Sequence, residues 1–398
     1  MLVSTVEMAW RTRGAGKLGL TRVDGVGLDW SALIARKNRI VAAWSKGKEP
    51  GLERKGITVL RGRARFVGPH ELEVGDRRVS SEWIVIATGS APARPPVPGI
   101  EHALTSDQLL DRTERPERMV VIGGGMIGME LGFALARAGT RVTVLQSGPQ
   151  VLPAVDDELR TALTELGRAT GLEIRTQARV TRITADRTVE AEIDGAPHRF
   201  PADLVLAATG RPPNTAGLGL EAAGVAVEGG AVRVNEFRQS PSAPHVYAAG
   251  DVNGQHQHTP VAWYEGRLVA RNALEGNRHA VDFSVFPTTV FTIPALAQVG
   301  LTEAEARRQG LRVAVGRAPF EDNPAAGVRH ETEGLVKVVY EEPSGRILGV
   351  HILGPAAEDL IHIAAVALRG KLSRQDLAGM HYVFPTLGGA VFDAMWGD

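Results

Sequence analysis

The spacing of apolar residues changes along this chain, and the change separates helical segments from strands. Val6, Ala9 and Trp10 recur at helical spacing, and a second helix is expected over about 30–48, after a glycine-containing loop at 14–27. Beyond this second helix the apolar runs become short, which is typical of strands. The expected strands cover 57–60, 64–66, 71–74, 78–79 and 84–87.

A proline-rich stretch at 92–98 follows these strands and predicts a stiff connection between domains. After it, buried strands alternate with helices, which is the pattern of a parallel sheet covered by other elements. The expected elements are a strand at 119–122, a helix ending near 139, a strand at 141–146, a helix at 156–170, a hairpin-like region from 173 to 193, and strands at 203–207 and 246–248. From about residue 278 the pattern changes to hairpins and helices, so a separate α+β domain is expected there.

One short segment combines a strand, a glycine turn and the start of a helix. The apolar run Met119 to Ile122 leads directly into Gly123-x-Gly125-x-x-Gly128. In such a loop the first glycine permits a tight turn, the second lets a pyrophosphate approach the backbone, and the third lets the helix pack closely on the strand. The helix N-terminus then points at the phosphates. This order predicts a dinucleotide site, and a glycine-rich turn in another α/β protein is the alternative.

Two strands end in the same tripeptide, Ala87-Thr88-Gly89 and Ala208-Thr209-Gly210. This repeat predicts two related dinucleotide-binding units. A further strand ends at Gly250-Asp251, where the carboxylate can accept hydrogen bonds from ligand hydroxyls or cap the segment that follows. The expected fold class is therefore α/β, with two Rossmann-like dinucleotide-binding domains, the first of them truncated, and a C-terminal α+β dimerisation domain.

Composition excludes several classes of function. At 398 residues the chain is long enough for two or three domains. Basic and acidic residues both number 45, so the formal net charge is zero and nucleic acid is not favoured as a partner. No apolar run has membrane-span length and no signal peptide is recognisable, so a cytoplasmic protein is expected. There is no cysteine, which excludes disulfides, thiolate metal sites and a thiol redox centre from these residues, and no metal site is predicted.

Together these motifs resemble the pyridine nucleotide-disulfide oxidoreductase family, flavoproteins that include dihydrolipoamide dehydrogenase, glutathione reductase and mercuric reductase. The similar segments occur in the family's order at 61–66, 86–90, 98–100, 105–107, 123–130, 208–214, 249–251, 299–303 and 347–354. The resemblance implies FAD and NAD(P) as cofactors and a homodimer. It also implies an FAD-binding domain at 1–100 and 223–277, an NAD(P)-binding domain at 101–222, and a dimerisation domain at 278–398.

The resemblance further implies which residues lie on the cofactors. Those expected at FAD are Ala64, Thr88, Gly89, Asp251 and Thr259. Those expected at the nicotinamide dinucleotide are Gly123, Gly125, Gly128, Glu130, Gln146, Val180 and Gly210. A helix-surface carboxylate is the alternative for Glu130. Gln146 stands where NAD-preferring members place glutamate, and because no basic residue lies between it and Asp156, NAD is favoured over NADP.

The chain departs from the family's pattern at the residues that carry redox chemistry. The family's opening βαβ unit, with its own glycine loop for FAD, and the Cys-x4-Cys pair after it have no counterpart ahead of Met1, so roughly 30 residues or more of the FAD domain are expected to be missing. Near the C-terminus, Phe384 and Gly389 occupy the positions of the family's general base histidine and its glutamate. His381 is expected to be a surface or interface residue. No catalytic residue is therefore predicted.

The leading interpretation is an FAD-dependent NAD(P)H oxidoreductase that passes hydride from nicotinamide to flavin and on to a small-molecule or small-protein acceptor. Quinone or oxygen reduction is favoured, or a mercuric-reductase-like activity if upstream residues supply cysteines. The alternative is a non-catalytic NAD(P)-binding dimer or a truncated gene product. Poor FAD binding is expected, because the glycine loop that would hold the FAD pyrophosphate at a helix N-terminus is absent. Loss of the opening strand should also leave the strands at 84–87 and 246–248 with unpaired backbone and exposed apolar faces, so aggregation is expected in this region.

Overall fold

The computed structural model describes residues 1–23 and 25–396, and the chain divides into two compact units. The first comprises Met1–Lys37, Arg94–Thr209 and Ser284–Asp398, and the second comprises Asn38–Ala93 and Gly210–Phe283. The assignment of the ranges 1–100, 101–222, 223–277 and 278–398 to particular cofactors and to dimerisation stays a prediction.

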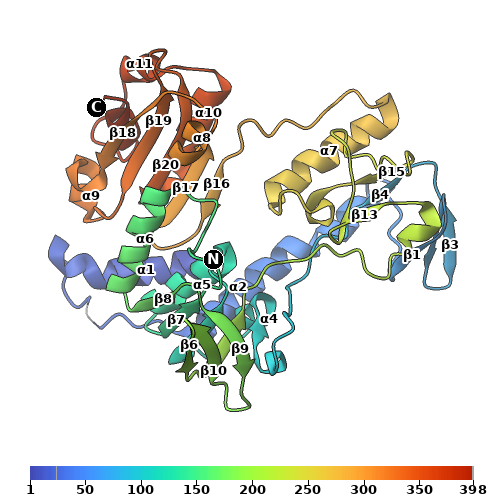
Figure 1. Ribbon diagram of the computed structural model, residues 1–398, viewed down its shortest axis with the longest axis horizontal. Coiled ribbons are helices and arrows are strands. Elements are labelled where there is room, and N and C mark those ends of the chain that lie inside the picture. The colour runs from blue at the N-terminus through green and yellow to red at the C-terminus, as the bar shows by residue number, and fades with distance from the viewer. Residues whose placement is uncertain (24, 397–398) are drawn as a thin grey trace. The chain divides into compact units, whose positions relative to one another are not determined.

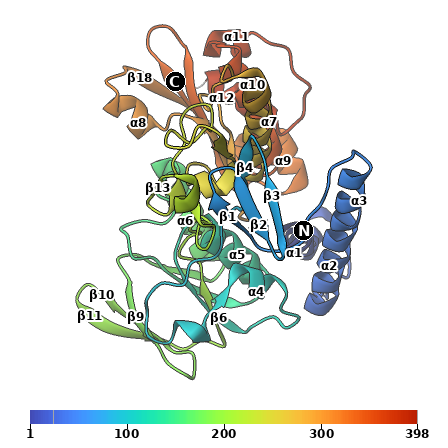
Figure 2. The same ribbon diagram turned by 90° about the vertical axis from the view of Figure 1, so that its right-hand side faces the viewer.

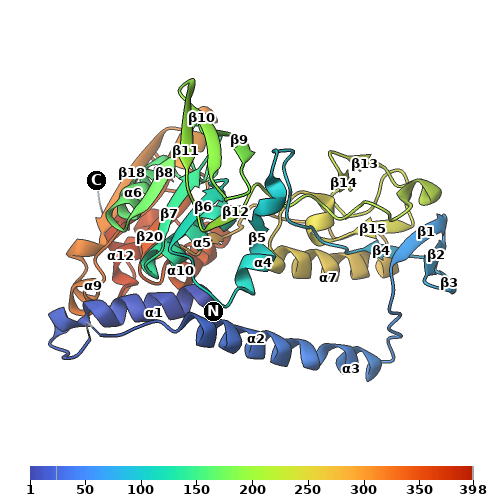
Figure 3. The ribbon, with the colours of Figure 1, turned by 90° about the horizontal axis from the view of Figure 1, so that it is seen from below.

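A five-stranded parallel sheet lies in the segment Arg94–Thr209 of the first unit. Its order is β5-β12-β6-β7-β8; Figure 1 shows β6, β7 and β8, and Figure 3 shows all five strands. The strands are β5 (Leu104–Thr105), β6 (Arg118–Ile122), β7 (Arg141–Leu145), β8 (Leu172–Arg175) and β12 (Leu204–Ala207). Its central strand β6 is apolar along its length because both faces are covered. Met119 and Val121 pack in one core with Phe133 of α5 (Met126–Arg137), whereas Val120 and Ile122 belong to a core on the opposite face.

A separate antiparallel sheet covers that opposite face. It consists of β9 (Arg179–Ile183), β10 (Val189–Ile193) and β11 (Ala196–Phe200). The predicted hairpin-like region at 173–193 is therefore wrong in its first strand, because β8 pairs in parallel with β7 instead. Leu172 is buried and packs near α5 and α6 (Asp157–Ala169), and this long-range burial sets the partner of β8.

The C-terminal part of the first unit is an antiparallel sheet with helices, which confirms the expected α+β architecture. The sheet order is β16-β17-β20-β19-β18, with α10 on β17 and β20 and with α12 on β18 and β19. The strands are β16 (Thr288–Val290), β17 (Ala295–Gly300), β18 (Val313–Pro319), β19 (Leu335–Glu341) and β20 (Ile347–Gly354). The helices are α8 (Glu303–Arg308), α9 (Pro324–Arg329), α10 (Ala357–Arg369), α11 (Arg374–Ala378) and α12 (Gly389–Trp396).

Two N-terminal helices form as the apolar spacing predicts, α1 (Leu2–Gly14) and α2 (Trp30–Lys46) (Figure 3). The short helix α3 (Lys48–Glu53), which that spacing does not predict, follows them. Buried Val6 places α1 against α5. The strand expected at 57–60 is wrong, because these residues adopt no regular secondary structure. Ile57 is exposed, and within residues 1–23 and 25–396 no strand pairs with the segment to supply ladder hydrogen bonds.

The second unit contains an antiparallel meander and a parallel strand pair. The meander is β1 (Ala64–Gly68), β2 (Glu71–Val74) and β3 (Arg77–Ser80), seen in Figure 2. The parallel pair is β4 (Ile84–Ile86) and β15 (Val246–Ala248). This unit also contains the short helix α3, the hairpin of β13 (Val227–Glu228) and β14 (Ala231–Val232), two 3-10 turns at 220–223 and 250–253, and the helix α7 (Thr259–Glu275).

The expectation that β4 and β15 would have unpaired backbone is wrong for β15 and for one edge of β4. The two strands pair with each other, and β15 also exchanges hydrogen bonds with residues 238–240. Ile84, Ile86 and Val246 are buried in a shared core, so the apolar side of the pair is covered, and only Val85 is exposed. Among the described residues no strand pairs with the second edge of β4.

Candidate functional site

The Gly123–Gly128 loop joins β6 to the N-terminus of α5, as its sequence predicts. Gly123 has a φ of 107°, and a Cβ there would lie 2.4 Å from the carbonyl oxygen of Ala208. A Cβ on Gly128 would lie 2.0 Å from the carbonyl oxygen of Gly123. At Gly125 a Cβ would meet nothing within 4 Å. Packing therefore requires glycine at 123 and 128, whereas Gly125 borders open space.

That open space lies at the start of α5, which carries no side-chain cap. Gly125 is the N-cap residue, and no side chain accepts a hydrogen bond from the first turn of the helix. The first N–H groups of a helix have no intrahelical partner and carry partial positive charge. An uncapped helix N-terminus beside open space fits a phosphate group, and it is the arrangement in which pyrophosphates bind to such loops.

Gln146, directly after β7, holds this loop in place. Its side-chain Oε1 accepts a hydrogen bond of 2.8 Å from the N–H of Gly124. Its own backbone N–H donates to the carbonyl oxygen of Arg175 at the end of β8. Because the oxygen of the amide is engaged, the amide NH₂ is the group that remains for an acceptor on a ligand. The predicted contact of Gln146 with a nucleotide ribose stays a prediction.

Glu130 lies one turn into α5 beyond the loop. Its Oε1 accepts a hydrogen bond of 2.9 Å from the N–H of Phe291 in the C-terminal part of the same unit. Burial raises the pKa of the Glu130 carboxyl, and the Phe291 N–H opposes that rise in pKa. Glu130 is therefore not the simple helix-surface carboxylate of the alternative interpretation, and its contact with a nicotinamide stays a prediction.

In the second unit, the candidate residues gather beyond the C-terminal ends of β4 and β15. Asp251 follows β15, and its Oδ2 accepts a hydrogen bond of 2.6 Å from Ser90 Oγ, which follows β4. Arg211 Nε donates in turn to Ser90 Oγ at 3.1 Å. Asp251 does not cap the helical turn 250–253, whose N-cap residue is Ala249, so the capping alternative is wrong. Ligands of open parallel sheets bind at this end of the strands.

Thr88 and Gly89 form the neighbouring part of the same edge. Thr88 Oγ1 donates to the carbonyl oxygen of Asn214 at 2.7 Å, and the Asn214 side chain donates back to the Thr88 carbonyl oxygen at 3.0 Å. Gly89 has a φ of 69° and open space where a Cβ would stand. A half-buried carboxylate beside an open glycine fits the hydroxyl-bearing part of a dinucleotide such as FAD.

The other predicted residues occupy less distinctive positions. Ala64 begins β1 and Thr259 begins α7, and both are exposed. Val180 lies on β9 with its side chain half-buried. Gly210 has a φ of 112° and open space around it. The contacts of these four residues with cofactors stay predictions.

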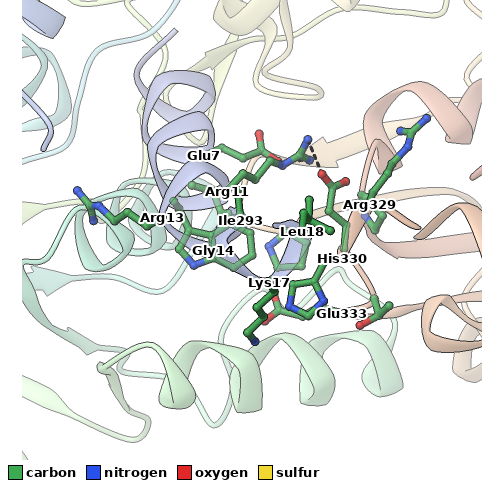
Figure 4. Close-up of a pocket in the computed structure, with 16 residues that line it drawn as sticks. Glu7, Arg11, Arg13, Gly14, Lys17, Leu18, Ile293, Arg329, His330 and Glu333 are labelled. Carbon is green, nitrogen blue, oxygen red and sulfur yellow. Dashed lines mark hydrogen bonds and ion pairs between the residues drawn. The ribbon is translucent and has the colours of Figure 1, made fainter. Parts of the chain in front are cut away.

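The G-x-G-x-x-G spacing occurs a second time, at Gly14–Gly19, where sequence reasoning did not identify it. This segment is the end of α1 and a short 3-10 helix, and it follows no strand. It therefore lacks the strand that a dinucleotide loop requires. Instead, Gly14, Lys17 and Leu18 border a cavity of about 540 Å³ that contains none of the predicted site residues (Figure 4).

A second cavity, also of about 540 Å³, adjoins the Asp251 turn. Its lining includes Arg211, Asn253, Gln255 and Gln257. Asn253 also contacts a buried glutamate, Glu265 of α7, through a hydrogen bond of 2.8 Å. Sequence reasoning missed Glu265, because a single acidic residue in an amphipathic helix gives no signal that it will be buried.

Comparison with known proteins decides the family. The model of the pyridine nucleotide-disulphide oxidoreductase family matches residues 24–266, and that of the family's dimerisation domain matches residues 286–395. The chain belongs to the pyridine nucleotide-disulphide oxidoreductase family. Members of this family bind FAD and use NAD(P)H, and the membership makes the chain an oxidoreductase by resemblance.

Relatives of this oxidoreductase carry three different names. It is 37% identical to dihydrolipoyl dehydrogenase of Thermus scotoductus over 99% of this chain and 86% of the relative. It is 34% identical to glutathione reductase of Burkholderia cepacia, over 90% of this chain and 80% of the relative. It is 36% identical to mercuric reductase of Staphylococcus aureus, over 88% of this chain, but it spans only 65% of that relative.

A solved structure confirms the fold of this oxidoreductase. The flavoprotein disulfide reductase RclA from Escherichia coli, determined as a Cu(II) complex, is 28% identical, with a TM-score of 0.88. The match covers 100% of this chain and 88% of that chain. This chain therefore shares its α/β fold class with known flavoproteins. It also shares the oxidoreductase domain and the dimerisation domain with them.

In the C-terminal segment of the oxidoreductase, Phe384 and Gly389 occupy the positions of the family's histidine and glutamate, and neither can act as an acid or a base. The side chain of Phe384 is 70% exposed, and Gly389 is buried at the start of α12. His381 is exposed, consistent with the expected surface position. Within residues 1–23 and 25–396, no three or more His, Asp or Glu side chains are grouped to hold a metal ion. None of the helices described in this structure has the length and apolar character of a membrane span.

Proposed function

We propose that this protein is an FAD-dependent NAD(P)H oxidoreductase whose electron acceptor is a small molecule such as a quinone or oxygen. The observation that carries the proposal is the open, uncapped N-terminus of α5 at Gly125, because it fits the pyrophosphate of the electron donor. Asp251 and Gly89, at the ends of adjacent parallel strands, support a second dinucleotide in the other unit. Bound flavin supplies the chemistry of accepting a hydride from nicotinamide.

The chain's own residues bind and orient in this scheme. The backbone of Gly125 and the first N–H groups of α5 hold the pyrophosphate of NAD(P)H. Gln146 fixes the loop through Gly124 and presents its NH₂ to the ribose. Glu130, held by Phe291, orients the nicotinamide end of the same molecule. Asp251 accepts hydrogen bonds from hydroxyls of the flavin cofactor, and Ser90 fixes its orientation.

The acceptor follows from the side chains available for proton transfer and thiol chemistry. The sequence contains no cysteine, and Phe384 and Gly389 cannot act as a general base and the carboxylate that orients it. Both features disfavour oxidation of a dithiol such as dihydrolipoamide by these residues. A quinone or oxygen requires neither. A mercuric-ion acceptor is the second candidate, because a relative of this chain is named mercuric reductase, and it would need thiolates from outside these residues.

We also propose that the protein acts as a homodimer through its dimerisation domain. The matched domain at 286–395 carries several large apolar side chains that are exposed. Val366 on α10 is at least 70% exposed, and so are the two consecutive residues Val383 and Phe384. Exposed apolar groups on one domain of a soluble chain are typical of a protein interface.

The test of the proposed function is the spectrum of the purified protein and its response to NADH. Because poor FAD binding is expected, the protein is first incubated with excess FAD. Flavin absorbance at about 450 nm is then expected, and anaerobic NADH is expected to bleach it. Benzoquinone or oxygen is then expected to restore the absorbance, whereas dihydrolipoamide should not reduce the flavin. Protein that binds NADH but never carries or takes up FAD would contradict the proposal and support a non-catalytic NAD(P)-binding dimer.

A Gln146→Glu substitution is expected to raise the preference for NADH over NADPH by roughly tenfold, or about 1.4 kcal/mol. The glutamate keeps an oxygen for the Gly124 N–H, but its charge repels a ribose 2′-phosphate and accepts a bond from a 2′-hydroxyl. The measurement is the dissociation constant of each nucleotide. Gln146→Ala is the control, since it removes the loop contact and should weaken both nucleotides alike. Equal affinities in the glutamate variant would place the ribose elsewhere.

A further inference from the structure

A buried ion pair lies directly beneath the turn that carries Asp251. Arg238 Nε is 2.8 Å from Glu265 Oε1, and the two side chains are 2% and 0% exposed. All of these residues belong to the second unit. Burying two charges is costly unless further hydrogen bonds satisfy them. The hydrogen bonds made by the other atoms of these two residues therefore indicate the structural role of the pair.

The second carboxylate oxygen of Glu265 holds both ends of the turn. Glu265 Oε2 accepts a hydrogen bond of 2.6 Å from the N–H of Gly250 and another of 2.8 Å from Asn253 Nδ2. Gly250 and Asn253 are the first and last residues of the helical turn 250–253, and Asp251 lies between them. A single carboxylate thus sets the conformation of the four residues that present the Asp251 side chain.

Arg238 anchors that carboxylate to the sheet. Its carbonyl oxygen accepts a hydrogen bond of 2.9 Å from the N–H of Ala248, the last residue of β15. Its guanidinium lies 5.4 Å from the ring centre of Phe283. The ring centre of His256 lies 4.5 Å from that of the same phenylalanine. The arginine therefore connects the end of β15 with the α7 carboxylate across the base of the turn.

We propose that Glu265 and Arg238 are positioning residues for the flavin site, because they hold the turn so that Asp251 points beyond the strand ends toward the hydroxyls of the cofactor. This inference rests on the proposed function. It adds two residues that touch no predicted ligand and act through Gly250 and Asn253. Ser90 holds the Asp251 carboxylate, and Glu265 holds the backbone N–H of the preceding residue, Gly250.

The test compares Glu265→Gln with Asp156→Asn, a control in the first unit. Asp156 also belongs to a buried ion pair, with Lys337, and the two side chains are 2% and 3% exposed. Each variant replaces a buried carboxylate by the amide of the same shape. In Glu265→Gln the carboxylate charge is lost, and the new NH₂ faces donors either on the turn or on Arg238. The two bonds to the turn are therefore lost or become weaker bonds to a neutral amide. Only this variant should alter the Asp251 turn.

The first readout is hydrogen exchange of the peptide covering 249–254, without added flavin. Glu265→Gln is expected to speed this exchange by about tenfold, because a bond to a charged group is lost, whereas Asp156→Asn should leave it unchanged. The second readout is the dissociation constant for added FAD, which should rise roughly tenfold in Glu265→Gln alone. Unchanged exchange at 249–254, or equal changes in the two variants, would overturn the proposal.

Two further results distinguish failure of this inference from failure of the proposed function. If the wild-type protein binds no FAD, the proposed function fails, but the exchange experiment still tests whether Glu265 holds the turn. If Glu265→Gln does not fold, Asn253→Ala replaces it, because it removes one bond to Glu265 and leaves the buried ion pair intact. That variant should speed exchange at 249–254 by about threefold, and no change would again overturn the proposal.

Discussion

A Gly125→Ala substitution is expected to weaken NAD(P)H binding by roughly 5- to 150-fold while leaving the stability of the protein unchanged. The new Cβ meets no protein atom within 4 Å and the φ of Gly125 is −75°, so alanine fits the backbone. It would instead occupy the space through which a pyrophosphate reaches the first turn of α5. Overpacking of this kind costs about 1–3 kcal/mol, which gives the expected range. Titration calorimetry with NADH measures it.

Gly128→Ala is the matched control for that experiment. Its Cβ would lie 2.0 Å from the carbonyl oxygen of Gly123, so the helix and the strand would have to move apart. This variant should lose about 1–3 kcal/mol of unfolding free energy or more, measured by urea denaturation. Normal NADH binding by Gly125→Ala would show that the nucleotide does not approach this loop. Equal destabilisation by the two variants would contradict the different packing of the two glycines.

A Lys337→Ala substitution is expected to lower the unfolding free energy of the first unit by about 3–5 kcal/mol. The ammonium of Lys337 is 3% exposed and lies within 3.1 Å of carboxylate oxygens of Asp156, Glu158 and Glu303. Its removal leaves these carboxylates close together, and that of Asp156 remains buried. Arg317→Ala is the control, since Arg317 pairs with Glu158 at the edge of the same cluster but is 46% exposed. It should cost less than about 1 kcal/mol.

The pH dependence of this difference follows from the direction of each pKa shift. The hydrogen bond from Arg317 lowers the pKa of Glu158. Burial raises the pKa of Glu303, but the hydrogen bonds from Lys337 and Arg307 outweigh burial, so the pKa of Glu303 is lowered overall. Burial lowers the pKa of Lys337, but its three carboxylate partners raise it overall. Carboxylates with lowered pKa stabilise above their unfolded value of about 4.3, and a lysine with a raised pKa stabilises below about 10.4.

The loss caused by Lys337→Ala should therefore be largest between about pH 5 and 9, and it should shrink as the pH falls through the lowered pKa values of the carboxylates. Urea denaturation of both proteins across this range measures the difference. A difference between wild type and variant that stays constant down to about pH 2 would contradict the assignment of the stabilising charge to this cluster.

The sequence by itself determined the family, the fold class and the central glycine loop. These features are local: a strand, a turn that only glycine can form and a helix start occupy 119–130 without interruption. Strands such as β19 and β20 were also predictable, because they are mostly apolar and rich in β-branched residues, with Lys337 and His351 as polar interruptions. Gln146 was identified from its place after β7, although its bond to Gly124 was not.

Only the tertiary structure decided which strands pair and which charged groups are buried. β8 joined the parallel sheet because Leu172 packs near α5 and α6, and α5 lies far from it in the sequence. β4 found a partner in β15, more than 150 residues later, and 57–60 found none. Glu265 and Lys337 look like ordinary surface charges in the sequence. Their burial depends on partners brought from distant segments, because a buried charge is stable only where the fold supplies its counter-charge and hydrogen bonds.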